Sequence, residues 1–187
     1  PEAAYVAGVD LGGTQLRAAI ADLACTIVAE ASETTDLRGG AAVVAQIAAL
    51  AGRLAEDNGI PRDRIRLLAV GTPGVLDARS GTIRVAPNIS GFDRIDVVGQ
   101  LREAFGIDVI LENDVNVGAL GERWLGRARG IDTFAYVALG TGLGMGVVSE
   151  GRIIRGAHGG AGEIANLPLG GDPFDPANRV HGTLETA

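Results

Sequence analysis

The most informative part of the sequence is Val109-Ile110-Leu111-Glu112-Asn113-Asp114. A short apolar run ends in three consecutive polar side chains, and a helical pattern follows over Val115 to Gly121. This pattern is typical of a buried strand that carries carboxylates and an amide to the edge of a sheet. In open α/β sheets, ligands collect just beyond the carboxyl ends of the strands. The alternative is that Asp114 only caps the helix, because Asp is a favoured N-cap residue.

Length, composition and charge limit the class of protein. The 187 residues are enough for one large domain or two small ones with a real core. No run approaches the roughly 20 apolar residues that span a bilayer, so we expect no membrane partner. A net charge of −7 without a basic run opposes direct contact with nucleic acid, since such contact rests on clustered cations. Any DNA binding would belong to a segment outside this chain.

Cys25 is the single cysteine of the chain. One cysteine excludes an internal disulfide and fits the reducing conditions of a cytoplasmic protein. Its apolar, strand-like context predicts a core or half-buried position.

A glycine turn near the start of the chain is the first candidate ligand site. Tyr5 to Val9 predicts a buried strand that ends in Asp10, and residues 16–20 predict the returning strand. Between them lies Leu11-Gly12-Gly13-Thr14. Glycines let backbone N–H groups approach an anion closely, as in phosphate-binding nests. An ordinary Gly-Gly hairpin is the alternative, but the adjoining Asp10 and Thr14 favour phosphate.

The same arrangement recurs later in the chain. Gly140-Thr141-Gly142-Leu143-Gly144 lies between predicted strands at residues 134–139 and 145–148. Two such turns, with the strand-end Asp114 between them, predict two lobes that grip one polyphosphate.

The remaining elements follow from hydrophobic periodicity. Residues 41–58 predict a helix with Val43, Ile47, Leu50 and Leu54 on its buried stripe. Trp124 lies on the apolar stripe of the helix after Asp114, which predicts a core position rather than a stacking platform. The other predicted elements are strands at residues 26–29, 65–70, 82–85 and 107–111 and a short helix over residues 97–105 that Gly106 ends.

Taken together, the motifs resemble the ROK family of sugar kinases and sugar-responsive repressors. They occur in the family's order and spacing from the first strand to the end of the chain. The matching segments are Asp10-Leu11-Gly12-Gly13-Thr14, Gly71-Thr72-Pro73-Gly74, Pro87-Asn88, Glu112-Asn113-Asp114, residues 139–144 and residues 159–164.

The resemblance implies an α/β protein with the actin-like ATPase (ribonuclease H-like) fold, with two lobes of mixed sheets around a central cleft. Residues 1–112 would form the N-terminal lobe with the first phosphate loop. Residues 113–187 would begin the C-terminal lobe, with the second phosphate loop and a sugar-binding loop. That lobe would be incomplete, so the chain is expected to be a fragment of a longer protein.

The resemblance also implies roles for individual residues. Asp114 would be the general base toward a sugar hydroxyl, which agrees with the need for a carboxylate within reach of that group. Other hydroxyls of a hexose-type sugar would be bound by Asn88, Asn113, Glu163 and Glu185, together with Asp114. Nucleotide phosphates would be held by Asp10, Gly12, Gly13, Thr14, Thr141 and Gly142, with Asp10 near magnesium.

The sequence departs from the family pattern at its zinc motif. Family kinases usually follow the Gly-Glu pair with Gly-His, whereas Ala165 and Asn166 stand here. Residues 172–183, where the family carries three zinc-binding cysteines, contain none, and His181 alone cannot form a structural zinc site. We therefore expect no zinc, and we read His158 and His181 as loop or surface residues. Met145 replaces a glycine and is expected to crowd a nucleotide.

Three functions stay open at this stage. The departures favour the sugar-binding domain of a ROK-type transcriptional regulator, whose DNA-binding segment would lie outside this chain. The intact Asp114 and both glycine turns favour an ATP-dependent hexose kinase with Mg-ATP as its cofactor. The third possibility is an assembly module that binds neither ligand. By the habit of the family we expect a homo-oligomer in the cytoplasm.

Overall fold

The computed structural model describes residues 4–77, 82–85, 89–140, 142–167 and 172. The chain contains two compact units, Pro1–Asp114 and Val115–Ala187, and each is described by itself.

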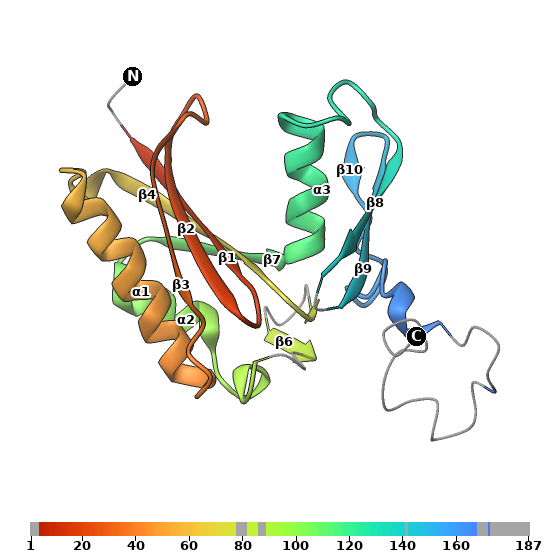
Figure 1. Cartoon of the computed structure of the whole chain (residues 1–187), viewed down its shortest axis with the longest axis horizontal. Coiled ribbons are helices and arrows are strands. Elements are labelled where there is room, and N and C mark those ends of the chain that lie inside the picture. The colour runs from red at the N-terminus through yellow and green to blue at the C-terminus, as the bar shows by residue number, and fades with distance from the viewer. Residues whose placement is uncertain (1–3, 78–81, 86–88, 141, 168–171, 173–187) are drawn as a thin grey trace. The chain divides into compact units, whose positions relative to one another are not determined.

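A five-stranded mixed sheet organises the first unit, in the order β3-β2-β1-β4-β7 (Figure 1). Hairpins join β1, β2 and β3 as antiparallel neighbours, whereas β4 and β7 run parallel to β1. Parallel neighbours need a crossover connection, and helices supply it here. The strands are β1 (Tyr5–Leu11), β2 (Gln15–Asp22), β3 (Ile27–Thr34), β4 (Ile65–Thr72) and β7 (Asp108–Asn113).

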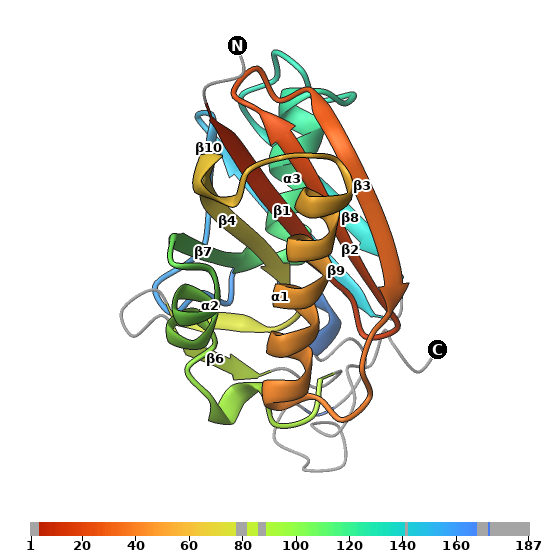
Figure 2. The same cartoon turned by 90° about the vertical axis from the view of Figure 1, so that its left-hand side faces the viewer.

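Two helices, α1 (Gly40–Asp57) and α2 (Val97–Phe105), cover one face of this sheet (Figures 1 and 2). The predicted helix over residues 41–58 is confirmed, and its stripe of Val43, Ile47, Leu50 and Leu54 is buried. The sheet contributes alternate residues to the same core, because successive strand residues point to opposite faces. These core residues include Leu16, Ile20, Leu68, Val70, Val109 and Leu111.

Local capping fixes the ends of α2. The Asp96 side chain accepts a hydrogen bond from the Gly99 amide at 2.8 Å, as an N-cap residue does. Gly106 ends the helix in the left-handed conformation, as the sequence predicts. Short elements complete the first unit: η1 (Arg62–Arg64), β5 (Val75–Asp77), β6 (Thr82–Val85) and η2 (Phe92–Arg94). No helix in the described part of the chain combines the length and the apolar content that crossing a bilayer requires.

In the second unit, helix α3 packs against a small antiparallel sheet of order β10-β9-β8. The contact is close because Gly144 and Gly146 have no side chains: a Cβ on Gly146 would lie 2.8 Å from the Ala119 Cβ and 2.9 Å from the Val115 carbonyl oxygen. The elements are α3 (Asp114–Trp124), β8 (Phe134–Leu139), β9 (Leu143–Ser149), β10 (Arg152–Ile153) and η3 (Ile164–Asn166).

Two sequence-based predictions about burial are wrong. Trp124 is 61% exposed, because α3 meets β9 through its small residues and not through the stripe that carries Trp124. Cys25 is exposed with φ of 62°, since it lies in the turn between β2 and β3 rather than in a strand. β7 also extends two residues beyond its predicted end, so Glu112 and Asn113 belong to the strand itself.

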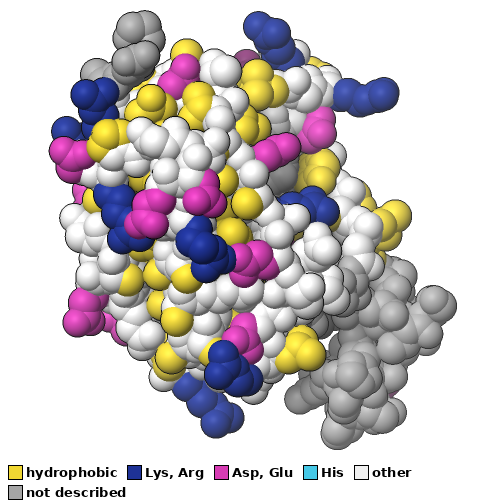
Figure 3. Space-filling model, turned by 60° about the vertical axis from the view of Figure 1, so that its left-hand side comes forward, with side chains coloured by type: hydrophobic (Ala, Val, Ile, Leu, Met, Phe, Trp, Pro, Cys, Tyr) yellow, Lys and Arg dark blue, Asp and Glu magenta, His cyan; other side chains and the backbone are white. Residues whose placement is uncertain are grey.

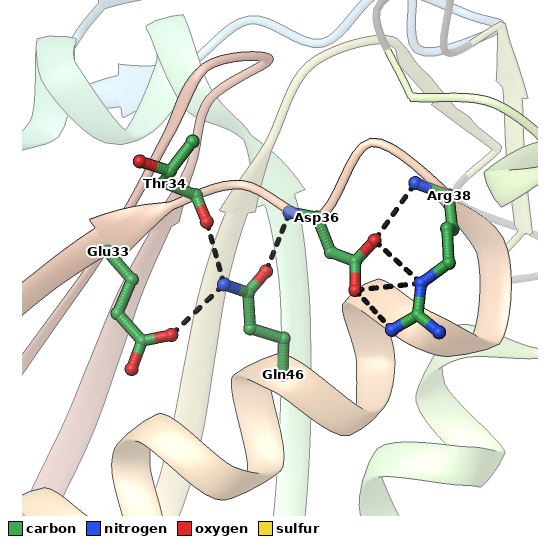
Figure 4. Close-up of polar contacts among 5 residues, drawn as sticks. All are labelled: Glu33, Thr34, Asp36, Arg38 and Gln46. Carbon is green, nitrogen blue, oxygen red and sulfur yellow. Dashed lines mark hydrogen bonds and ion pairs between the residues drawn. The ribbon is translucent and has the colours of Figure 1, made fainter.

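The connection between β3 and α1 is held by Asp36 (Figure 4). Its carboxylate accepts hydrogen bonds from the Arg38 side chain, at 2.6 Å from Nη2, and from the Arg38 amide at 2.9 Å. These bonds favour the charged form, and they lower the pKa of Asp36 from 3.8 to about 2, the side-chain bond contributing most. Since the folded-state pKa is depressed, the stabilisation is present above the ordinary pKa and is lost as the pH falls toward 2.

Arg38→Ala tests this interaction. Without the guanidinium, the pKa of Asp36 should rise toward its ordinary value of 3.8, which an NMR titration of the Asp36 carboxyl carbon measures directly. Arg53→Ala is the matched control, because Arg53 forms an ion pair with Glu33 instead and should leave the titration of Asp36 unchanged. An unchanged Asp36 pKa in Arg38→Ala would contradict the assigned cause.

Candidate functional site

Three parallel strands bring polar residues to one level at the carboxyl-terminal edge of the first sheet. Asp10 on β1 pairs with Gly71 on β4, and Gly71 pairs with Glu112 on β7. Since neighbouring strands lie about 4.8 Å apart, the backbones of Asp10 and Glu112 are separated by roughly 10 Å. Both carboxylates lie on the face opposite α1 and α2, because Leu11 and Leu111 next to them point into the core. The carboxylate of Asp10 is exposed.

The next residue of β7, Asn113, points to the opposite face of the strand from Glu112 and is held by hydrogen bonds. Its side-chain amide donates a hydrogen bond to the Gly74 carbonyl at 3.1 Å, and its backbone N–H donates one to Glu112 Oε1 at 3.0 Å. Gly74 has φ of 106°, which favours glycine, so the turn after β4 is shaped to meet Asn113. The predicted sugar-binding amide is therefore oriented by the turn that follows β4.

Asp114 follows without a linker as the first residue of α3. A carboxylate in the first turn of a helix is stabilised by the helix dipole. Asp114 therefore lies at a helix start, as the alternative interpretation of a helix cap expects. Its half-buried carboxylate also lies at the sheet edge beside Asn113. The two roles are compatible.

The first glycine turn is closed by its own hairpin. The Gly12 amide donates to the Gln15 carbonyl at 2.9 Å, and a Cβ on Gly12 would lie 3.0 Å from that same oxygen. Thr14 is exposed at the tip, and Gly12 and Gly13 are half-buried. The turn thus offers backbone groups with little side-chain cover, as an anion site requires.

In the second unit, the structure links the second glycine turn to Glu163. The Gly140 amide donates to the Gly142 carbonyl at 2.9 Å, which closes that turn. Farther along β9, the Met145 amide donates to the Gly162 carbonyl at 3.0 Å, and this bond fixes the loop that carries Glu163. Gly142 and Met145 are three residues apart on an extended segment, or roughly 10 Å. Met145 points away from α3, because Gly144 and Gly146 face that helix.

Some predicted residues cannot be placed. Asn88, Thr141 and Glu185 lie outside the described residues, and so does His181. Their roles stay predictions, as do those of the described site residues toward a ligand.

The sequence did not predict Thr35, which hydrogen-bonds the first glycine turn. Gly74 and Gly162 belong to predicted motifs, but their hydrogen bonds with Asn113 and Met145 were not predicted. Thr35 had one usable signal: the β2–β3 hairpin pairs Gln15 with Thr34, which brings the next residue to the turn.

Within the described ranges, no three His, Cys, Asp or Glu side chains gather closely enough to hold a metal ion. Asp10, an exposed carboxylate beside a glycine turn, fits the role of a single protein ligand or water-mediated partner for magnesium that is held mainly by phosphates.

Comparisons with known proteins agree with this architecture. The model of the ROK family matches residues 6–179. A glucokinase of Halalkalibacterium halodurans is 36% identical over 97% of this chain and 56% of its own length. A xylose repressor of Bacillus subtilis is 28% identical over 90% of this chain and 43% of its own length. The chain therefore spans about half the length of these curated relatives.

A solved structure extends the likeness to three dimensions. The ROK family glucokinase of Streptomyces griseus, in complex with glucose and AMPPNP, superposes with a TM-score of 0.78 at 29% identity. The match covers 86% of this chain and 49% of that one. The predicted actin-like ATPase fold is confirmed.

Gly162→Ala tests how Glu163 is positioned. Gly162 has φ of 92°, and an added Cβ would lie 1.7 Å from the Met145 carbonyl oxygen, so the loop must move away from β9. The Met145 amide, which donates to Gly162, should then exchange its hydrogen about tenfold faster or more. Gly160→Ala is the matched control, because its added Cβ meets only the Glu163 Cγ at 4.0 Å. Equal exchange rates in the two variants would show that the loop is held in another way.

Proposed function

The chain belongs to the ROK family, and from this premise we propose that it is the sugar-binding, kinase-like domain of a regulator that senses a sugar. The observation that carries the choice of a regulator is Asn166. This residue ends η3 at the position where the resemblance places the histidine of the kinases' Gly-His pair, and Ala165 takes the place of the glycine. An amide is not among the usual protein ligands of zinc, and residues 172–183 supply no cysteine.

The sugar would be bound by directed hydrogen bonds. A neutral polyol offers donors and acceptors in several directions, and amide and carboxylate side chains match them. Asn113 at the end of β7 and Asp114 at the start of α3 would supply such hydrogen bonds. Glu163 would supply others from its loop, which is hydrogen-bonded to β9. Asn88 and Glu185 would complete the set.

Sensing requires that the sugar prefer one conformation of the protein. A ligand shifts an equilibrium only by the difference in its affinity for the two states. We propose that the DNA-contacting segment lies outside these residues. On the face drawn in Figure 3, acidic and basic side chains are interspersed rather than gathered by sign. This distribution differs from the continuous basic surface typical of DNA-binding domains.

A second candidate function is an ATP-dependent hexose kinase, and the placement of Asp114 favours it. A carboxylate fixed at a helix start beside a sugar-binding amide can accept the proton of an attacking hydroxyl. The phosphates of Mg-ATP would be held by the two glycine turns, through Gly12, Gly13, Thr14, Thr141 and Gly142, with Asp10 near the magnesium ion. Such a reaction needs positioning and charge neutralisation more than covalent chemistry.

The first test is a panel of hexoses offered to the full-length protein. A ligand that binds only the folded state stabilises it, by about 2.7 kcal/mol when its concentration is a hundred times its Kd. One hexose should therefore raise the melting temperature and weaken binding to the protein's own operator DNA, with no ADP formed from Mg-ATP. ADP formation would favour the kinase instead, and no thermal shift with any hexose would contradict both functions.

Asp114→Asn separates two roles of this side chain, proton acceptance and sugar binding. An amide keeps the shape and one acceptor but cannot take a proton, so any sugar phosphorylation should fall by a factor of about 100 or more. Sugar affinity should change much less. Asp108→Asn is the matched control, since Asp108 is exposed at the opposite end of β7. Equal turnover in Asp114→Asn and Asp108→Asn would remove Asp114 from the chemistry.

A further inference from the structure

Thr35 is a buried polar residue that supports the first glycine turn from outside it. It directly follows β3 and is only 4% exposed. Its hydroxyl donates a hydrogen bond to the Gly12 carbonyl at 2.7 Å, and its amide donates one to the Thr14 carbonyl at 3.0 Å. A single residue thus holds both ends of the first glycine turn. Because an unpaired buried hydroxyl is costly, the bond to Gly12 disfavours other shapes of the turn.

The residues on either side of Thr35 are held by Gln46 on α1 (Figure 4). The Gln46 side-chain amide donates to the Thr34 carbonyl at 2.8 Å and accepts from the Asp36 amide at 2.9 Å. The Gln46 side chain therefore hydrogen-bonds to the backbone on both sides of Thr35. The same amide also donates to Glu33 Oε2 at 3.0 Å. Since α1 packs into the core, these hydrogen bonds connect residues 33–36 to a close-packed part of the unit.

The bond from the Thr35 hydroxyl also sets the direction of one amide of the turn. In a trans peptide the C=O and the N–H point in opposite directions. When Thr35 holds the Gly12 carbonyl, the Gly13 N–H of the same peptide is aimed away from Thr35. The Gly13 amide then points to the side of the turn that Thr35 does not occupy, where an anion can meet it.

We propose that Thr35 is a positioning residue for phosphate binding, held in place by Gln46, and that it acts on nucleotide affinity without acting on the sugar. This inference rests on the phosphate-binding role proposed above for the Gly12–Thr14 turn. Thr35 touches no substrate. It favours the shape of the turn in which the Gly13 amide is aimed away from Thr35, toward a phosphate.

The test uses three variants of the full-length protein. Thr35→Val keeps the shape of the side chain and removes the hydroxyl, and Thr35→Ser restores it. Thr34→Val is the matched control, because it makes the same chemical change one residue away, at an exposed side chain whose backbone carbonyl still receives Gln46. Three quantities are measured: affinity for Mg-ATP, affinity for the hexose that stabilises the protein, and hydrogen exchange of residues 11–16.

Thr35→Val should bind Mg-ATP about tenfold more weakly, which corresponds to one lost hydrogen bond. Exchange over residues 11–16 should accelerate, and hexose affinity should stay within about twofold, because Asn113, Asp114 and Glu163 lie on other elements. Thr35→Ser and Thr34→Val should both resemble the wild type. If Thr35→Val does not fold, Gln46→Leu serves as the second variant, because it leaves Thr35 in place and should cause the same selective loss.

Other outcomes overturn the proposal in distinguishable ways. Unchanged exchange and unchanged Mg-ATP affinity in Thr35→Val would show that Thr35 does not shape the turn. Equal losses of hexose and Mg-ATP affinity would show a general structural role. Faster exchange together with a wild-type protein that binds no Mg-ATP would overturn the phosphate role of the turn, while hexose binding would still support the proposed sugar-sensing function.

Discussion

The parallel pairing of β4 with both β1 and β7 is the constraint on which the rest of the structure depends. It brings Asp10, Gly71 and Glu112, which are far apart in the sequence, to one level at the same sheet edge. A shift of register by one residue would turn every side chain to the opposite face. Such a shift would place Val70 and Leu111 in solvent and Glu112 in the core, so the hydrophobic core enforces the geometry of the polar edge.

The sequence predicted an element well when large side chains bury one of its faces. Helix α1 has its apolar stripe at the predicted positions, and Gly106 ends α2 as expected. The prediction failed for Trp124, because α3 is seated through Ala119 against two glycines of β9. Close packing of small residues leaves almost no hydrophobic signal. Periodicity therefore pointed to the larger stripe, which is exposed in the part of the chain that the structure describes.

The candidate site also has a part that could be predicted from the sequence and a part that could not. Its polar residues could be predicted, because Asp10 and the Glu112–Asp114 triplet follow apolar strand runs directly. The contacts that orient them could not, since they join residues that only the folded sheet brings together. Thr35 meets a turn more than 20 residues earlier, and Asn113 meets Gly74. Each contact uses a backbone carbonyl as its acceptor, and a carbonyl has no signature in the sequence.

The glycines of β9 have a mechanical consequence. Gly144 and Gly146 lie so close to Val115 that a Cβ would fit on neither: it would lie 2.7 Å from Val115 Cγ2 at Gly144 and 2.9 Å from the Val115 carbonyl oxygen at Gly146. Val115 directly follows Asp114, and Gly144 lies just beyond the second glycine turn. Close-packed interiors pass on displacement rather than absorb it. A displacement of β9 would therefore move the start of α3 as well.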